Sequence, residues 1–449
     1  MCFLRIITTS TKKEKVKNMK NMHLCPLDLS MVGDDLYLHS YLQFHVENQQ
    51  GTLKGVLSAI GIPMTSYAYA RKNGFLKSKR VKEAILDYFG MTLEIDEKVY
   101  QVLQTQVWTA ITESYFISAE NLRNVQEKLA EMKPLVKKTP LYLLYCLAYV
   151  SSIDHFVAKE KHKKELEDEI IPFLDYVKDT MTKDMQYFYL FSLTEYYFVS
   201  DKDDLALTFI DQYESLDPFV DERLKTMGYY DLFTLYALKE NYPRALWYLD
   251  KCHDLCFKYY NVKRLQALRQ NQTAIHYRSQ NYEEALSNAL GDMLYIYRQD
   301  IQENRVFFKN MIIIIVVSLI YLKRYEEALE KIQLFFEFNV EEYYDQALLL
   351  KQFCYYKLED KTGYSSIKDE EKSLKANGIT FSDTYHTLYH LIDQFNQKDK
   401  KALKDFGSVL KPLIKDTMSP YRRIFGLLKD EYTEYLKQNE RYIDVLDMK

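Results

Sequence analysis

A short pattern that recurs about every forty residues constrains the fold of this 449-residue chain more than any other feature. Its clearest copies are Tyr282-Glu283-Glu284-Ala285 and Tyr325-Glu326-Glu327-Ala328, each within an amphipathic segment. Equivalent small residues occur at Ala206, Ala245, Ala285, Ala328, Ser366 and Ala402, at intervals of 39, 40, 43, 38 and 36 residues. A unit this short cannot bury its own apolar face, so consecutive units must stack into an array.

The pattern is similar to that of tetratricopeptide-like repeats, in which each unit is a pair of antiparallel helices. The small residue lets the second helix lie close against the first, and the preceding aromatic residue fills the gap between units. The resemblance implies a right-handed α-solenoid of helical hairpins over residues 136–449. The low content of Gly, 12, and Pro, 9, also favours an all-α chain over a loop-rich or β-rich one. The apolar run Met311–Leu322 is shorter than the roughly 20 residues that span a bilayer, so we expect a core helix there and no membrane segment.

A second segment, residues 52–89, predicts a compact group of short helices with a strong positive charge. The expected helices are Thr52–Ile60, Pro63–Asn73 and Ser78–Phe89, and Gly61 suits the tight turn between the first two. The basic residues of this segment are Lys54, Arg71, Lys72, Lys77, Lys79, Arg80 and Lys82, and no acidic residue lies between Gly51 and Lys82. In a chain of net charge −4, this basic island is typical of phosphate-backbone binding, the alternative being an ordinary solvated helical face.

Residues 51–74 resemble the helix-turn-helix of the phage-repressor (XRE) class. Gly61-Ile62 matches the turn of that pattern and Gly74 its closing glycine, whereas Pro63, Leu57 and Arg71 depart from its usual Ser, Ala and Glu. The resemblance implies binding of double-stranded DNA, with the base-reading positions at Met64, Thr65, Ser66 and Tyr69. The neighbouring basic residues Arg71, Lys72, Lys77, Lys79 and Arg80 would then contact the DNA backbone.

Polar residues also recur in phase on the first helix of the repeats. The positions eleven residues before each head aromatic, or its equivalent, are Ser192, Asp231, Asn271, Ile314 and Gln352, of which only Ile314 is apolar. In such solenoids the first helices line the concave side, where a carboxamide can donate to and accept from the backbone of an extended peptide. The sequence therefore predicts a peptide-binding groove, and the alternative is that this position is merely exposed to solvent.

Candidate catalytic or metal-binding groups are few. Cys252 and Cys256 are spaced as a pair on one helical face, but no second pair of ligands completes a zinc site, so we interpret them as buried structural thiols. His386 and His390 lack the glutamate that marks a metalloprotease helix. We expect no metal, no cofactor and no enzymatic activity. The six cysteines form no paired framework, which favours a reducing compartment such as the cytoplasm.

The whole arrangement resembles the RRNPP group of peptide-pheromone receptors, which join an XRE-type helix-turn-helix to tetratricopeptide-like repeats. The resemblance covers residues 35–449 and implies a dimeric transcription regulator whose DNA binding is switched by a short signalling peptide. Asn271 matches the peptide-clamping asparagine of that group in type and offset, and Asn310 lies one turn before the matching position of the next repeat.

The sequence as a whole predicts four parts: a tail or extended translation start (1–30), the helix-turn-helix domain (31–95), connecting helices (96–135) and the repeat domain (136–449). Two alternatives remain open. One is a repeat scaffold that regulates other proteins without DNA or a peptide ligand. The other is a DNA-binding regulator whose repeats serve only dimerisation.

Overall fold

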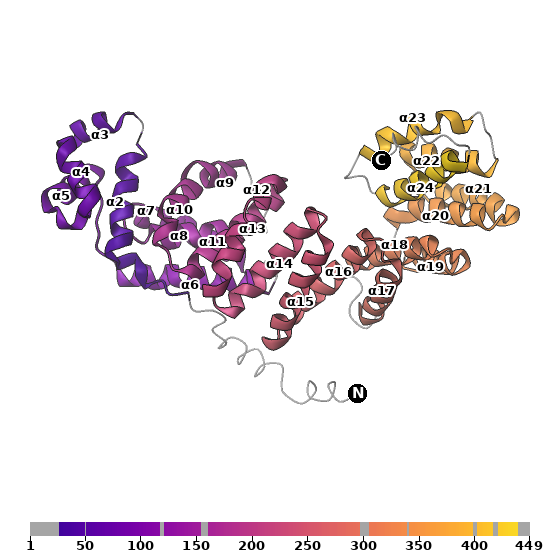
Figure 1. Cartoon of the computed structure of the whole chain (residues 1–449), viewed down its shortest axis with the longest axis horizontal. Coiled ribbons are helices and arrows are strands. Elements are labelled where there is room, and N and C mark those ends of the chain that lie inside the picture. The colour runs from indigo at the N-terminus through magenta and orange to yellow at the C-terminus, as the bar shows by residue number, and fades with distance from the viewer. Residues whose placement is uncertain are drawn as a thin grey trace. The chain divides into compact units, whose positions relative to one another are not determined.

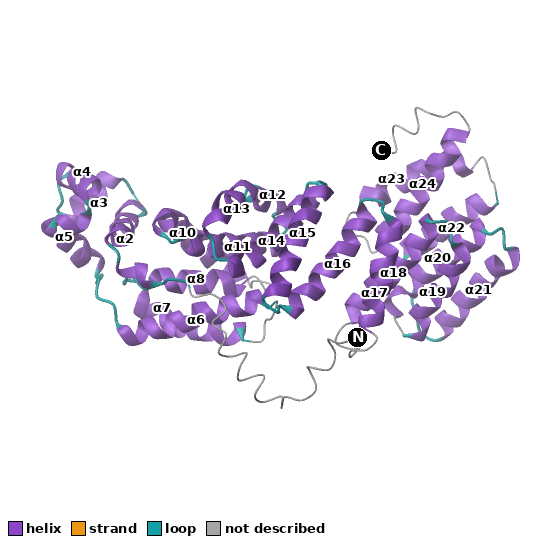
Figure 2. Cartoon of the chain, turned by 60° about the horizontal axis from the view of Figure 1, so that its bottom comes forward, coloured by secondary structure: helices purple, strands orange, loops and turns teal. Residues whose placement is uncertain are grey.

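The computed structural model describes residues 27–49, 51–116, 121–153, 160–296, 305–338, 341–397, 402–415 and 421–438. Within these ranges every regular element is helical, as expected for an all-α chain (Figures 1 and 2). Residues 1–26, which make up most of the expected tail, lie outside this description. The contacts divide the chain into two compact units, Met1–Leu268 and Arg269–Lys449, which are described separately below.

The first unit contains α2 (Asp35–Glu47), α3 (Leu53–Ile60), α4 (Met64–Asn73), α5 (Lys79–Phe89), α6 (Glu97–Tyr115), α7 (Leu122–Val136), α8 (Tyr142–Ile153), α9 (Glu160–Glu165), α10 (Ile171–Val177), α11 (Lys183–Val199), α12 (Asp203–Leu207), α13 (Ile210–Leu216), α14 (Glu222–Leu238), α15 (Tyr242–Lys258) and the start of α16 (Val262–Arg278). The second unit contains the rest of α16, then α17 (Tyr282–Ile296), α18 (Arg305–Tyr321), α19 (Tyr325–Glu337), α20 (Tyr344–Lys357), α21 (Lys361–Ala376), α22 (Asp383–Asn396), α23 (Ala402–Lys415) and α24 (Arg422–Gln438).

The helices α3, α4 and α5 form where the sequence predicts them. α3 and α5 pack on α2, and α4 packs on α3 and α5. Thr52 caps α3, because its hydroxyl accepts a hydrogen bond from the Gly55 amide at 3.2 Å. Gly61 ends α3 with a φ of 77°, a left-handed conformation that glycine adopts without steric cost. The buried side chains of Leu57, Tyr67 and Ile85 make the small core of this group.

The hairpins of the array share one turn geometry. Among the residues that the structure describes, six non-glycine residues have a left-handed φ: Asp201, Glu240, Tyr260, Gln280, Lys323 and Glu359. Five of these, all except Tyr260, follow the first helix of a hairpin at intervals of 39, 40, 43 and 36 residues. In each of these turns the next amide bonds back to a carbonyl five residues earlier, as from Asn241 to Tyr236 at 2.9 Å and from Asn281 to His276 at 2.8 Å. This is the hydrogen bond of a Schellman motif, and its recurrence gives a structural repeat independent of the alanine pattern.

Four of the alanines that define the repeat are fully buried. Ala206, Ala245, Ala285 and Ala328 are all 0% exposed. The apolar segment of α18 is also buried, from Met311 to Val317, which confirms that it is a core helix.

Larger side chains at these alanines should not fit. Ala285→Leu and Ala328→Leu are each expected to lower the free energy of unfolding by about 1–3 kcal/mol, because a filled site must push its neighbouring helix away. Denaturant titration followed by circular dichroism would measure this change. Unchanged midpoints in both variants would contradict the close helix crossing.

Tyrosine hydroxyls connect many of the helices through carboxylates. Glu214, for example, accepts hydrogen bonds from Tyr236 at 2.8 Å and from Tyr248 at 2.7 Å, and Arg244 pairs with it at 3.1 Å. Burial alone would raise the pKa of the Glu214 carboxyl, but the bonds from Tyr248, Tyr236 and Arg244 outweigh burial and lower this pKa. Such contacts give a structural role to part of the 40 tyrosines of the chain.

Candidate functional site

The residues expected to bind DNA lie on α4, on the turn after it and at the start of α5. Met64 and Tyr69 are 45% and 65% exposed, Thr65 is exposed, and Ser66 is half-buried. The expected backbone-contacting residues Arg71, Lys72, Lys77, Lys79 and Arg80 are all exposed. Tyr67 and Ala70 are buried and mark the inner face of α4, so the opposite face of this helix is exposed to solvent. The nine predicted residues therefore all lie on α4, on α5 and on the segment between them, helices that Figure 1 shows next to each other.

A carboxylate at the end of α2 holds the inner side of α4. Glu47 accepts hydrogen bonds from Tyr67 at 2.8 Å and from Tyr176 of α10 at 2.7 Å, and Arg71 Nε lies 3.5 Å from its Oε1. Further aromatic contacts join α2 to the same place, since the rings of Phe44 and Tyr176 are 5.4 Å apart. The basic group, defined here as the helices α3, α4 and α5, is thus joined to the array through α2 and α10.

Three of the residues expected to line a peptide groove are buried in the structure. Ser192 donates to the Phe188 carbonyl at 3.0 Å and is 0% exposed. Asp231, also 0% exposed, accepts a hydrogen bond from Tyr213. Gln352, equally buried, donates to Tyr364 Oη at 2.7 Å and to the Tyr389 carbonyl at 3.2 Å.

The physical reason is that the helices carrying these residues are covered on several sides. α14 packs against α6, α11, α13 and α15, and α20 against α18, α19, α21, α22 and α24. Burial, together with the nearby Glu195 carboxylate, raises the pKa of Asp231 well above its usual range. The alternative that these positions are merely solvent-exposed is therefore wrong for Ser192, Asp231 and Gln352. A peptide contact by any of them stays a prediction.

The remaining peptide candidates belong to the second unit. Asn271 is half-buried on α16, and Asn310 lies in α18, where its side chain is outside the described residues. Ile314, the apolar member of the series, is buried at 2% exposure. Ser192 and Asp231 belong to the first unit, whereas Asn271, Asn310 and Gln352 belong to the second.

A buried arginine that the sequence did not single out binds the end of α6. Arg264 is 2% exposed, and its guanidinium donates to the Ser114 carbonyl at 2.6 Å and to the Tyr115 carbonyl at 3.2 Å. Asn261 donates to the same Tyr115 carbonyl at 2.6 Å, and its own oxygen accepts from the Arg264 amide at 3.1 Å. The four residues form a clamp, defined here as Ser114, Tyr115, Asn261 and Arg264, which joins parts of the chain almost 150 residues apart.

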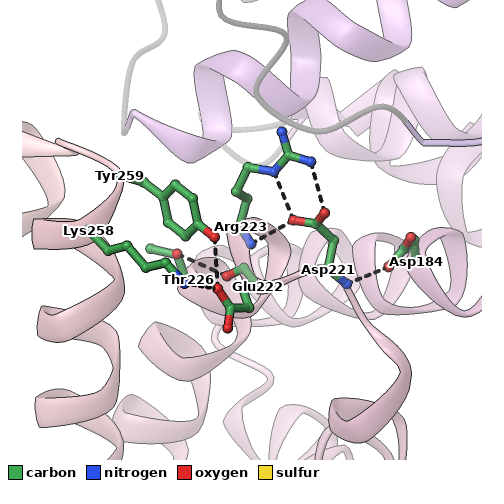
Figure 3. Close-up of polar contacts among 7 residues, drawn as sticks. All are labelled: Asp184, Asp221, Glu222, Arg223, Thr226, Lys258 and Tyr259. Carbon is green, nitrogen blue, oxygen red and sulfur yellow. Dashed lines mark hydrogen bonds and ion pairs between the residues drawn. The ribbon is translucent and has the colours of Figure 1, made fainter.

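Ionic contacts tie the ends of α11, α14 and α15 together on the same unit (Figure 3). The Asp221 amide donates to Asp184 at 2.9 Å, and the Asp221 carboxylate pairs with Arg223, whose Nη2 lies 2.8 Å away. Glu222 accepts from Tyr259 at 2.8 Å and pairs with Lys258. These charges satisfy one another and hold the helix ends in place.

No group of three or more His, Cys, Asp or Glu side chains that could hold a metal ion occurs in the described part of the chain. Cys252 and Cys256 are fully buried, as interpreted from the sequence, and Cys252 donates to the Thr226 carbonyl at 3.1 Å. His386 and His390 are exposed on α22. None of the helices in the described ranges is long and apolar enough to cross a membrane.

Comparison with known proteins identifies the fold. No protein-family profile and no curated protein sequence matches this chain. Among solved structures, the apo form of RapI matches with a TM-score of 0.56 at 13% identity, over 77% of this chain and 95% of that chain. A Rap protein complexed with competence and sporulation factor gives 0.49 at 15% identity, covering 78% and 96%. Aspartyl phosphate phosphatase F from Bacillus subtilis gives 0.45 at 15%, covering 80% and 94%.

The likeness to RapI concerns the fold alone, because the sequences are so different. It agrees with the α-solenoid of helical hairpins that the repeat predicts. The assignment of α3 and α4 as a DNA-binding helix-turn-helix stays a prediction.

Proposed function

We propose that this chain is a non-enzymatic regulator in which the basic group α3–α5 binds duplex DNA and the helical array binds a short peptide that controls it. The observation that carries the DNA part is the basic island. Seven basic residues lie between Gly51 and Lys82 with no acidic residue among them, and six of the seven are exposed. Such a surface attracts a polyanion through release of its counterions.

The peptide part rests on the solenoid fold and on Asn271. Hairpin arrays present long rows of side chains from successive helices, a surface suited to an extended ligand. Asn271 is half-buried on α16 and carries a carboxamide, which can pair with both groups of a peptide bond. The resemblance to RRNPP receptors also implies a homodimer in the cytoplasm.

A second function is favoured by the way that the basic group is attached. Tyr37 of α2 donates to the Pro140 carbonyl at 2.7 Å, and the rings of Phe44 and Phe173 are 5.1 Å apart, so the group continues directly into the array. Exposed Met64 and Tyr69 add apolar surface beside the positive charges. A surface of this kind also suits an acidic protein, and the chain would then regulate a protein partner without binding DNA.

Salt-dependent duplex binding separates the two functions. The double variant Arg71→Ala, Lys72→Ala should bind duplex DNA about ten-fold or more weakly. It should also reduce the slope of log K against log[salt] by about 0.9 for each phosphate contact that these two residues make in the wild type. Fluorescence anisotropy with a labelled duplex at several salt concentrations measures both quantities.

The matched control is Lys361→Ala, Lys368→Ala, which removes the same charge from exposed positions on α21. It should leave the slope unchanged. If the Arg71 and Lys72 variant also keeps the wild-type slope, this surface does not bind DNA. A wild type that binds no duplex at low salt favours the protein-binding function.

A further inference from the structure

The carboxylate of Glu47 connects three helices of the first unit, α2, α4 and α10, on the inner side of α4. Glu47, the last residue of α2, accepts hydrogen bonds from Gln43 at 3.1 Å, from Tyr67 of α4 at 2.8 Å and from Tyr176 of α10 at 2.7 Å. Arg71 of α4 completes the set with an ion pair at 3.5 Å. Its two oxygens are divided between the helices, since Oε1 faces α4 and Oε2 faces α10.

Glu47 stays charged at neutral pH. Its side chain is 21% exposed, and this partial burial would raise its pKa. The hydrogen bonds from Tyr176, Tyr67 and Gln43 and the charge of Arg71 outweigh burial, so the pKa is lowered from its usual value. Hydrogen bonds to an ionised acceptor are stronger than those between neutral groups, so Glu47 fixes both partner helices firmly.

The partners of Glu47 on α4 belong to the proposed DNA surface. Tyr67 and Arg71 are one helical turn apart, so they lie on the same side of α4. The Arg71 side chain remains 56% exposed and can therefore reach outward, but its Nε is held from behind by Glu47. A phosphate and Glu47 would compete for the same guanidinium.

Tyr176, the partner of Glu47 on α10, belongs to a helix with an unusual start. Residues Leu166–Ile170, directly before α10, form a π-helical turn. Such turns often mark places where a helix changes register or carries out a function. A shift of α10 would move Tyr176 and therefore the carboxylate that it binds.

We propose that Glu47 is a positioning residue that couples the basic group to the array. Its carboxylate holds α4 on α10 and withholds Arg71 from phosphate. A movement of α10 that releases Glu47 therefore changes the DNA affinity of the basic group, although α10 is not part of that group. The phosphate part of this inference rests on the proposed function, whereas the positioning part does not.

Glu47→Gln tests the inference, because a glutamine keeps the size of the side chain but loses the charge that holds Arg71 and one of the two acceptor oxygens that Tyr67 and Tyr176 use. The control is Asp87→Asn, which makes the same change of charge on the exposed side of α5. Relative to that control, Glu47→Gln should tighten duplex binding about three- to ten-fold and steepen the salt slope by about 0.9, the value of one further phosphate contact.

A double-mutant cycle assigns the effect to Arg71. In a background of Arg71→Ala, the additional gain from Glu47→Gln should disappear, leaving only the change that Asp87→Asn also produces. An equal gain with and without Arg71, or an equal gain from Asp87→Asn in the wild type, would overturn the proposal that Glu47 withholds this arginine.

Hydrogen exchange without DNA tests the positioning part on its own. Tyr176→Phe removes the bond from α10 but keeps every charge, and it should speed amide exchange in α4 several-fold, as should Glu47→Gln. Asp87→Asn should not. Unchanged exchange in α4 in both variants would show that Glu47 does not position the helix. If the wild type binds no duplex but exchange changes as expected, the proposed DNA function fails and the positioning role of Glu47 stands.

Discussion

Arg264→Ala is expected to lower the free energy of unfolding of the first unit by about 3–5 kcal/mol, a cost at the upper end for single substitutions. The side chain is 2% exposed, so its removal leaves a cavity. It also leaves the Ser114 carbonyl without its 2.6 Å bond and weakens the bonding of the Tyr115 carbonyl. Both carbonyls lie in the last turn of α6, and a buried acceptor that is left unpaired costs about 1–3 kcal/mol.

The positive charge of Arg264 adds to this effect, because it faces the negative end of the α6 helix dipole. Its guanidinium also lies 4.9 Å from the centre of the Tyr230 ring, a contact that alanine abolishes. Arg264→Lys should recover only part of the loss, since an ammonium group cannot reproduce the planar fork that reaches both carbonyls.

Urea unfolding of the full chain, followed by tyrosine fluorescence and circular dichroism, measures this prediction. The matched control is Arg278→Ala, which makes the same change at the exposed end of the same helix and should alter stability by less than about 0.5 kcal/mol. Equal midpoints for the two variants would mean that the clamp contributes nothing to stability.

The parts of this fold that the sequence predicted are those with a local signal. The small residues Ala245, Ala285 and Ala328 recur in phase along the repeat, and all three are buried in the structure. Gly61 identifies the turn between α3 and α4, because few other residues adopt its left-handed φ readily. Both features are recognised from the few residues around them, so the local sequence was enough to find them.

The environment of a repeated position could not be predicted in the same way. The interval between Ser192 and Asp231 gives the phase of the helix but not the number of helices that cover it. In the structure both side chains are interior, because α11 packs between α8 and α14, and α14 packs between α11 and α15. The recurrence of polar residues therefore identified equivalent positions in successive repeats, but it did not predict whether these positions are exposed.

Long-range polar contacts left no signal in the sequence. Arg264 and Ser114 meet across 150 residues, and Glu47 and Tyr176 across 129. No rule of residue spacing predicts contacts between residues so far apart in the sequence, and the sequence around each of them is that of an ordinary helix. The nine predicted DNA-binding residues differ in this respect, because all of them lie within one segment of 17 residues, from Met64 to Arg80.

The second large effect concerns the peptide. If Asn271 pairs with the backbone of a bound peptide, Asn271→Ala leaves one donor and one acceptor of that peptide without partners. Each unmet hydrogen bond in a desolvated site costs about 1–3 kcal/mol, so peptide affinity should fall roughly ten-fold to several hundred-fold. Duplex binding in the absence of peptide should persist, because Asn271 is on α16 and the proposed DNA surface is on α3–α5.

The effect of peptide on DNA binding should then move to higher peptide concentration by the same factor. A ligand shifts a conformational equilibrium only through its difference in affinity for the two states, so a variant that binds the peptide more weakly in both states needs more peptide to reach the same shift. The measurement is duplex binding by the wild type and by Asn271→Ala, titrated with peptides below 1 kDa from spent medium of the source organism. Asn377→Ala, at the exposed end of α21, is the control for the same substitution elsewhere. A variant that responds at the wild-type concentration would place Asn271 outside the peptide site, and a wild type without any response would favour a regulator that has no peptide ligand.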